Sequence, residues 1–184
     1  MGLIFLIVII VIAAAAVGGV YNGLVRNRLL VKEASSGIDV QLKRRWDLIP
    51  KVVDTVKGYA QHEKSLMEKV TSMRSQMVSG ASLADRGKAE TELSATLKSI
   101  FALAEAYPDL KANRNFIQLQ TTLSEIEDQI QMSRRYYNGT VRDYNMMCQQ
   151  FPSGLVAGAF GFRPEPFFEL EYATQRQSPD VKFD

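Results

Sequence analysis

Residues 1–25 read MGLIFLIVIIVIAAAAVGGVYNGLV and contain no charged side chain. At 1.5 Å per residue, about 20 helical residues cross the ~30 Å hydrocarbon core of a bilayer. A buried helix in a small domain rarely contains 18 or more uninterrupted apolar residues. The stretch therefore predicts a transmembrane anchor over residues 1–25, and the rest of the chain is interpreted outward from it.

Positive charge follows the apolar stretch, and positive charge marks the cytoplasmic side of a membrane helix. Residues 26–57 contain four acids against eight basic residues, which are Arg26, Arg28, Lys32, Lys43, Arg44, Arg45, Lys51 and Lys57. A cleaved signal peptide is the alternative, because Ala13–Ala16 are small residues at a suitable place. Signal peptides, however, carry Lys or Arg before the apolar stretch, where only the α-amine stands here. We expect an uncleaved single-pass anchor with its N-terminus outside and the remaining chain in the cytoplasm.

Lipid modification is not indicated. Gly2 could be myristoylated only with Ser or Thr at position 6, where Leu6 stands. Cys148 is the single cysteine and lies far from the anchor. One cysteine allows no internal disulfide, which agrees with a reducing compartment.

Three small residues in the anchor, Ala15, Gly19 and Gly23, are spaced four apart. That spacing places them on one helical face, where small side chains let two transmembrane backbones approach closely. The face is a candidate for self-association, although chance spacing of common small residues is the alternative.

Residues 26–150 show helical periodicity and no clear strand alternation, which predicts an all-α fold. The expected helices cover about 24–46, 48–79, 84–106 and 113–150. The last is the clearest, with Asn113 as N-cap, Pro152 as stop and Ser133 as the one polar interruption of its apolar face. That face comprises Phe116, Leu119, Leu123, Ile126, Ile130, Tyr137, Val141, Tyr144, Cys148 and Phe151.

The other helices have apolar faces of the same kind. Asp47 is a candidate N-cap of the second helix, and Pro50 is tolerated in a first turn. Gly58 and Glu63 interrupt the pattern of that helix; Glu63 either pairs with a base on a neighbouring helix or is half exposed. The three faces comprise Leu24, Val31, Ala34, Ile38 and Leu42; Ile49, Val52, Val56, Tyr59, Leu66, Val70, Met73 and Met77; and Leu93, Leu97, Ile100 and Ala104.

Short turns at Ser79-Gly80 and Tyr107-Pro108-Asp109 predict antiparallel neighbours. The expected architecture is a long up-down four-helix bundle that continues from the transmembrane helix. In this topology the irregular, apolar tail, residues 151–184, emerges close to the bilayer. We expect it to contact lipid or a neighbouring subunit, or to pack back on its own bundle, through Leu155, Val156, Phe160, Phe162, Phe167 and Phe168.

The sequence offers little that indicates chemistry. With one histidine, His62, and one cysteine, ordinary His/Cys metal sites are not expected, and no phosphate-binding or nucleophile motif occurs. An enzyme site around His62 and Glu63 is the weakest alternative. Lys43-Arg44-Arg45 beside Trp46 only weakly suggests nucleic acid, because the net charge is +2. We expect no catalytic, cofactor or metal site, no nucleic acid and no small-molecule substrate.

Several strings of the chain resemble the LemA family. They are Ile38–Pro50, Val56–Glu63, Leu103–Asn113, Arg134–Asn138, Val141–Asn145 and Phe151-Pro152-Ser153. The resemblance implies a bacterial inner-membrane protein with one N-terminal span and a cytoplasmic helical bundle. The family also includes a magnetosome-associated protein, which implies a link to membrane organisation. It implies no agreed activity and no catalytic residue.

Two functions are therefore expected. The first is a non-enzymatic scaffold on the lipid bilayer that forms a homo-oligomer and organises membrane or envelope proteins. The alternative is a regulatory adaptor or sensor that binds a partner at its membrane-distal end. The candidate partner contacts of that end are Lys43, Arg44, Arg45, Trp46, Tyr107, Asp109 and Asn113.

Overall fold

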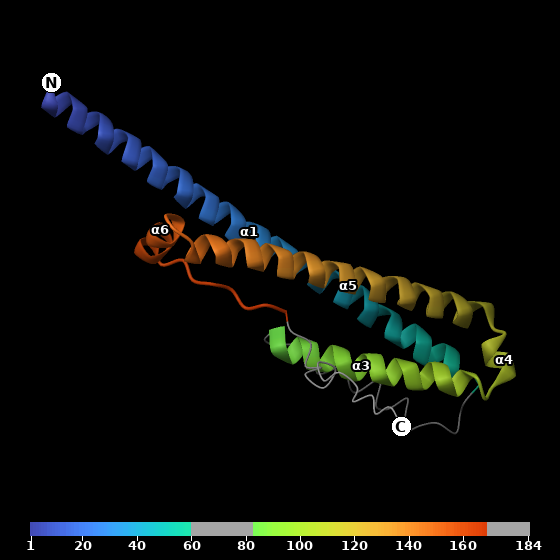
Figure 1. The fold of residues 1–184 in the computed structure, drawn as a ribbon. Helices are drawn as coiled ribbons and strands as arrows, with labels where there is room; N and C mark the ends of the chain where they lie inside the picture. The colour runs from blue at the N-terminus through green and yellow to red at the C-terminus, as the bar shows by residue number, and fades with distance from the viewer. Residues whose placement is uncertain (60–82, 169–184) are drawn as a thin grey trace, which may run out of the picture. The chain divides into compact units, whose positions relative to one another are not determined.

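The computed structural model describes residues 1–59 and 83–168, with the side chains of residues 83–89 left out. Within these ranges the regular structure is entirely helical, so the all-α prediction is confirmed for the described chain (Figure 1). A long, apolar N-terminal helix packs against a second long helix. The five helices are α1 (Gly2–Lys57), α3 (Leu83–Ala104), α4 (Pro108–Lys111), α5 (Arg114–Gln149) and α6 (Ser153–Phe160).

Helix α1 is continuous over 56 residues, so the predicted break between residues 46 and 48 is wrong. Asp47 does not cap a helix, and Pro50 lies inside one. A proline in a helix interior costs about 3 kcal/mol, because it removes one hydrogen bond and crowds the preceding turn. The buried residues on both sides of Pro50 offset that cost, since Leu42, Ile49 and Val56 continue one apolar face without a change of phase.

Helix α1 ends at Lys57, and Gly58 and Tyr59 form the turn that follows. Gly58 was predicted to lie in mid-helix, so this placement corrects the prediction. The remaining part of the predicted second helix lies outside the described residues. The same holds for His62, Glu63, the Ser79-Gly80 turn and the last part of the tail.

The chain divides into two compact units, and both long helices contribute to each. Unit 1 comprises Met1–Gln41 and Gln129–Phe167. Unit 2 is described through residues 42–59, 83–128 and 168.

In unit 1 the apolar face of α1 lies against the C-terminal part of α5. The Asn27 side chain donates to the Gly23 carbonyl at 2.9 Å and lies 3.1 Å from the Met147 sulfur. Arg134, rather than Ser133, is the polar residue buried in the apolar face of α5. The buried apolar side chains of unit 1 include Leu24, Val31, Ala34, Ile38, Ile130, Tyr137, Val141 and Tyr144.

In unit 2 a continuous core joins α1, α3, α4 and α5. The predicted bounds of the third helix match α3 closely, and the predicted Tyr107-Pro108-Asp109 turn contains the short helix α4. The core comprises Trp46, Ile49, Val52, Val53, Val56, Leu93, Leu97, Ile100, Ala104, Leu110, Phe116 and Leu123.

Both predicted ends of the last long helix are close to the observed ends of α5. Asn113 Oδ1 accepts from the backbone N–H groups of Asn115 and Phe116, at 2.9 and 3.2 Å, so Asn113 is the N-cap. At the other end α5 stops at Gln149. Cys148 is half-buried and Phe151 is exposed, so the prediction that both residues belong to the core is wrong.

Candidate functional site

Residues 2–19 of α1 form an apolar helix whose side chains are all exposed (Figure 1). Within the part of the chain that the structure describes, α1 is the one helix long and apolar enough to span a membrane. None of its most apolar window is buried against the protein. An N-terminal helix of this kind is a single membrane anchor or a signal sequence.

The small-residue face of the anchor is only partly open. Ala15 and Gly19 are exposed, and a Cβ added at Gly19 would meet no atom within 4 Å. A Cβ at Gly23 would lie 3.0 Å from the terminal methyl of Met147. Gly23 therefore serves packing within unit 1, while Ala15 and Gly19 remain accessible.

Helix α6 lies beside α1 at the end of the apolar stretch (Figure 1). The tail was predicted to be irregular throughout, and the presence of α6 corrects that prediction. The ring centroids of Phe160 and Phe162 lie 5.0 and 5.6 Å from that of Tyr21, in edge-on geometry. Both rings reach Tyr21 because Gly161 adopts a left-handed conformation, with φ of 74°, and turns the chain between them.

The extended segment after α6 is fixed to α5 by hydrogen bonds. The Asn145 side chain donates to the Glu165 carbonyl and accepts from the Glu165 N–H, both at 2.8 Å. The Tyr137 hydroxyl donates to the Pro166 carbonyl at 2.9 Å. The Glu165 carboxylate also lies 4.0 Å from Arg28. These contacts come from α1 and α5 together, so the tail of unit 1 has one defined position.

Two buried tyrosines of α5, Tyr137 and Tyr144, lie close to Glu165 of this segment. Burial first, and then the neighbouring Cys148, raise the pKa of Tyr144 to about 12. Burial, with the nearby Glu165 carboxylate, also raises the pKa of Tyr137 above its ordinary value. Both phenols therefore stay neutral in the folded protein over the physiological range.

The tail residues predicted to form a contact surface separate into two groups. Leu155, Phe160 and Phe167 are exposed, and Phe162 is half-buried. Val156 and Phe168 are buried within the chain, which agrees with the alternative that tail residues pack back on the protein. Val156 faces inward because Ser153, Val156 and Ala157 follow the 3-4 spacing of the buried side of α6.

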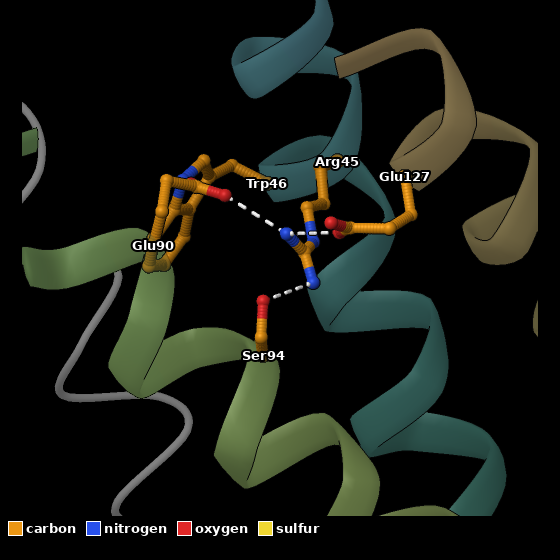
Figure 2. A network of polar contacts seen from close by, with 5 residues as sticks. All are labelled: Arg45, Trp46, Glu90, Ser94 and Glu127. Atoms are coloured by element: carbon orange, nitrogen blue, oxygen red, sulfur yellow. Dashed lines mark hydrogen bonds and ion pairs between the residues drawn. The ribbon is translucent and has the colours of Figure 1, made fainter. Parts of the chain in front are cut away.

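A buried ion network in unit 2 joins α1, α3 and α5 (Figure 2). Arg45 Nη1 donates to the Glu90 carboxylate at 2.9 Å and forms an ion pair with the Glu127 carboxylate at 2.8 Å. Arg45 Nη2 donates to the Ser94 hydroxyl at 2.9 Å, and Trp46 Nε1 donates to the second oxygen of Glu90 at 3.0 Å. The Arg45 and Glu90 side chains are 6% and 1% exposed, whereas Glu127 is 36% exposed.

This network fixes the position of the three helices along their axes relative to one another. A buried charge is tolerated only where its partners satisfy it. If one helix shifted along its axis by one residue, its polar groups would move away from their partners on the other two helices. Sequence reasoning missed Glu90. It lies three residues before Leu93 on the face that Leu97 and Ile100 continue, and that spacing was the available signal.

The partner-contact candidates were expected at the membrane-distal end, at a turn after Trp46 and at the turn from Tyr107 to Asn113. Residues 43–46 lie inside α1, with Arg45 and Trp46 buried and only Lys43 and Arg44 exposed. The predicted turn is absent because α1 does not break at Asp47. Tyr107 packs on the core of unit 2, and Asn113 caps α5 and donates to the Tyr59 hydroxyl at 2.9 Å. Asp109 is exposed on α4.

No cluster of three or more His, Cys, Asp or Glu side chains suited to a metal occurs in residues 1–59 and 83–168. The His62 and Glu63 pair lies outside these ranges.

The fold and these sites define a class of protein: a helical bundle whose first helix extends into a single N-terminal apolar segment. The model of the LemA family matches residues 34–183, and the chain belongs to the LemA family. A protein LemA of Metamycoplasma hominis is 33% identical over 141 residues, which cover 74% of this chain and 63% of that protein.

More distant similarity extends to proteins named for the magnetosome. Magnetosome protein MamQ 2 of Paramagnetospirillum magneticum is 23% identical over 175 residues, which cover 81% of this chain and 64% of that protein. Magnetosome protein MamQ of Magnetospirillum gryphiswaldense is 22% identical over 174 residues, with coverage of 80% and 64%. The chain therefore spans just under two thirds of the length of the curated relatives it matches.

Proposed function

We propose that the chain is a non-enzymatic, membrane-anchored helical scaffold of the bacterial inner membrane. Its N-terminus lies outside, its antiparallel helical bundle lies in the cytoplasm, and copies self-associate to organise membrane or envelope proteins. The observation that carries the proposal is the continuity of α1, whose bare apolar length runs without a break into the packed units. An unbroken helix transmits the position of the membrane span to the bundle without a flexible linker.

The polar groups of the bundle favour a structural role. In unit 2 the buried charges are engaged with one another and with Trp46 and Ser94, an arrangement that holds helices together. Self-association is proposed to use the accessible part of the small-residue face, Ala15 and Gly19.

The test is the mass of the full chain in nanodiscs and in mild detergent. We expect a homo-oligomer whose mass falls when Gly19→Ile blocks close approach of two helices. Gly18→Ile is the matched control, because Gly18 is equally open but lies about 100° around α1. Gly23 is unsuitable, since its contact with Met147 would confound folding with assembly.

A wild-type monomer, or equal masses for the Gly18→Ile and Gly19→Ile chains, would contradict self-association through this face. A small particle would instead favour the regulatory adaptor, which binds a partner through exposed bundle residues such as Asp109 on α4.

A further inference from the structure

Helix α6 has two apolar faces, and only one of them is covered by the protein. Ser153, Val156 and Ala157 are buried against unit 1. The opposite side consists of Leu155, Gly158 and Ala159, with Leu155 70% exposed. Phe160 follows Ala157 by three residues and contacts Tyr21, yet it is still 58% exposed. No charged residue interrupts α6. An eight-residue helix that is apolar on both sides is unfavourable in water, so its open face requires an apolar environment.

The depth of this face along α1 is fixed by Tyr21. Tyr21 is 19 residues from Gly2, which is about 28 Å of helix and matches the ~30 Å hydrocarbon thickness. Tyrosine is favoured at the boundary between hydrocarbon and headgroups, and here it contacts Phe160 and Phe162 directly. The open face of α6 therefore lies at the level where the membrane span ends.

Charged residues appear just beyond this level. Arg26 and Arg28 lie about 7–10 Å farther along α1, at headgroup depth. Arg163 follows α6 by three residues and is exposed. Apolar side chains at the boundary and basic side chains next to it are the composition of an interfacial membrane segment.

The position of α6 is also constrained on its protein side. Gly154 packs so closely that an added Cβ would lie 3.1 Å from the Cys148 carbonyl oxygen. Beyond α6, the paired hydrogen bonds between Asn145 and Glu165 hold the next segment on α5. Since both ends of α6 are fixed to the helices of unit 1, its open face keeps one orientation relative to α1.

We propose that α6 lies in the lipid interface of the same bilayer that α1 spans, with Leu155 and Phe160 inserted among the lipids. The inference rests on the proposed membrane anchoring and adds a second lipid contact to it. The occupant is lipid, because the open face continues the lipid-exposed surface of α1 at the depth of Tyr21. Two contacts on one rigid unit fix its rotation about the span, which α1 alone leaves free.

The test places tryptophan at Leu155 or Phe160 in the full chain, reconstituted in vesicles of zwitterionic and anionic phospholipid. Fluorescence is quenched by lipids spin-labelled near the headgroup end of the acyl chain and, separately, by aqueous iodide. Wild-type fluorescence supplies the contribution of Trp46. The matched control is Tyr136→Trp, because Tyr136 is 55% exposed on α5 of the same unit, about 20 Å of helix from Gln149.

We expect lipid quenching of Leu155→Trp and Phe160→Trp to exceed that of Tyr136→Trp at least about twofold, since interfacial helices bury their apolar face about 5–10 Å deep. Iodide should show the reverse order. Quenching equal to that of Tyr136→Trp would overturn the proposal. Protection from both quenchers would also overturn it, because protein would then cover the face. Ile10→Trp reports the anchor alone: if it too escapes lipid quenching, the membrane anchoring fails rather than the α6 contact.

Discussion

The buried ion network predicts that two glutamates bound to the same arginine differ greatly in their contribution to stability. Glu90 is buried and accepts from both Arg45 Nη1 and Trp46 Nε1, whereas Glu127 is 36% exposed and forms an ion pair with Arg45 (Figure 2). The perturbation is Glu90→Gln, with Glu127→Gln as its matched control. Both changes remove one charge and preserve the shape of the side chain.

The expected cost follows from the donors that Glu90 satisfies. A glutamine at position 90 accepts from Trp46 through its carbonyl oxygen, but its NH2 group then faces the Arg45 donor. Losing one buried charged hydrogen bond and opposing two donors should cost about 2–4 kcal/mol of the free energy of unfolding. Glu127→Gln should cost about 1 kcal/mol or less, because a partly exposed pair is screened by water.

Urea unfolding of the full chain in mild detergent measures both changes. Trp46 is the only tryptophan, so its fluorescence reports the network while circular dichroism reports the helices. The double variant Arg45→Met, Glu90→Gln should lose about 1–3 kcal/mol less free energy of unfolding than the two single variants lose together, because it removes the opposed donor. The reasoning is refuted if Glu90→Gln costs less than about 0.5 kcal/mol or no more than Glu127→Gln.

Two further predictions concern α5 and α1. Tyr144 should ionise near pH 12 in an absorbance titration, since burial and the neighbouring Cys148 raise its pKa and the folded state favours the neutral phenol. The stability that this adds is complete below pH 10 and is lost as the pH rises to about 12, and Tyr144→Phe should abolish that loss. Pro50→Ala should raise the free energy of unfolding by about 1–3 kcal/mol in the urea assay, because it restores a helical N–H donor to the Trp46 carbonyl. An unchanged or lower value would show that the proline is already accommodated.

The helical faces were predictable because burial repeats every three or four residues. The predicted apolar positions Leu24, Ile38, Leu97 and Ile130 are all buried in their units. The N-cap at Asn113 was also predictable, since its side-chain oxygen accepts from backbone groups two and three residues away.

The break at Asp47 was predicted wrongly because Asp47 and Pro50 both indicate a helix start, whereas the apolar face indicates a continuous helix. Asp47 followed by Pro50 is typical of a helix start. The apolar face, however, keeps its phase from Leu42 through Trp46 to Ile49, and burial on both sides outweighs the cost of one proline. Phase continuity over several turns was the better indicator.

The ion network could be located but not paired from the sequence. Arg45 and Glu90 each occupy a position of an apolar face, which predicts that they are buried. Which acid faces which base depends on the relative height of three helices, and helical periodicity carries no information on height. The pairing of Arg45 with Glu90 and Glu127 therefore required the structure.

The two proposed membrane contacts use different sides of α1 and can operate together. Successive residues of a helix are about 100° apart, so Gly19, two residues before Tyr21, lies about 160° around the axis from it. Ala15, six residues before Tyr21, lies about 120° away on the same criterion. Since Tyr21 carries the contact with α6, a second copy that packs on Ala15 and Gly19 would not displace α6. By fixing rotation about the span, the lipid contact of α6 would present the small-residue face of every copy in the same direction, which favours regular assembly in the plane of the membrane.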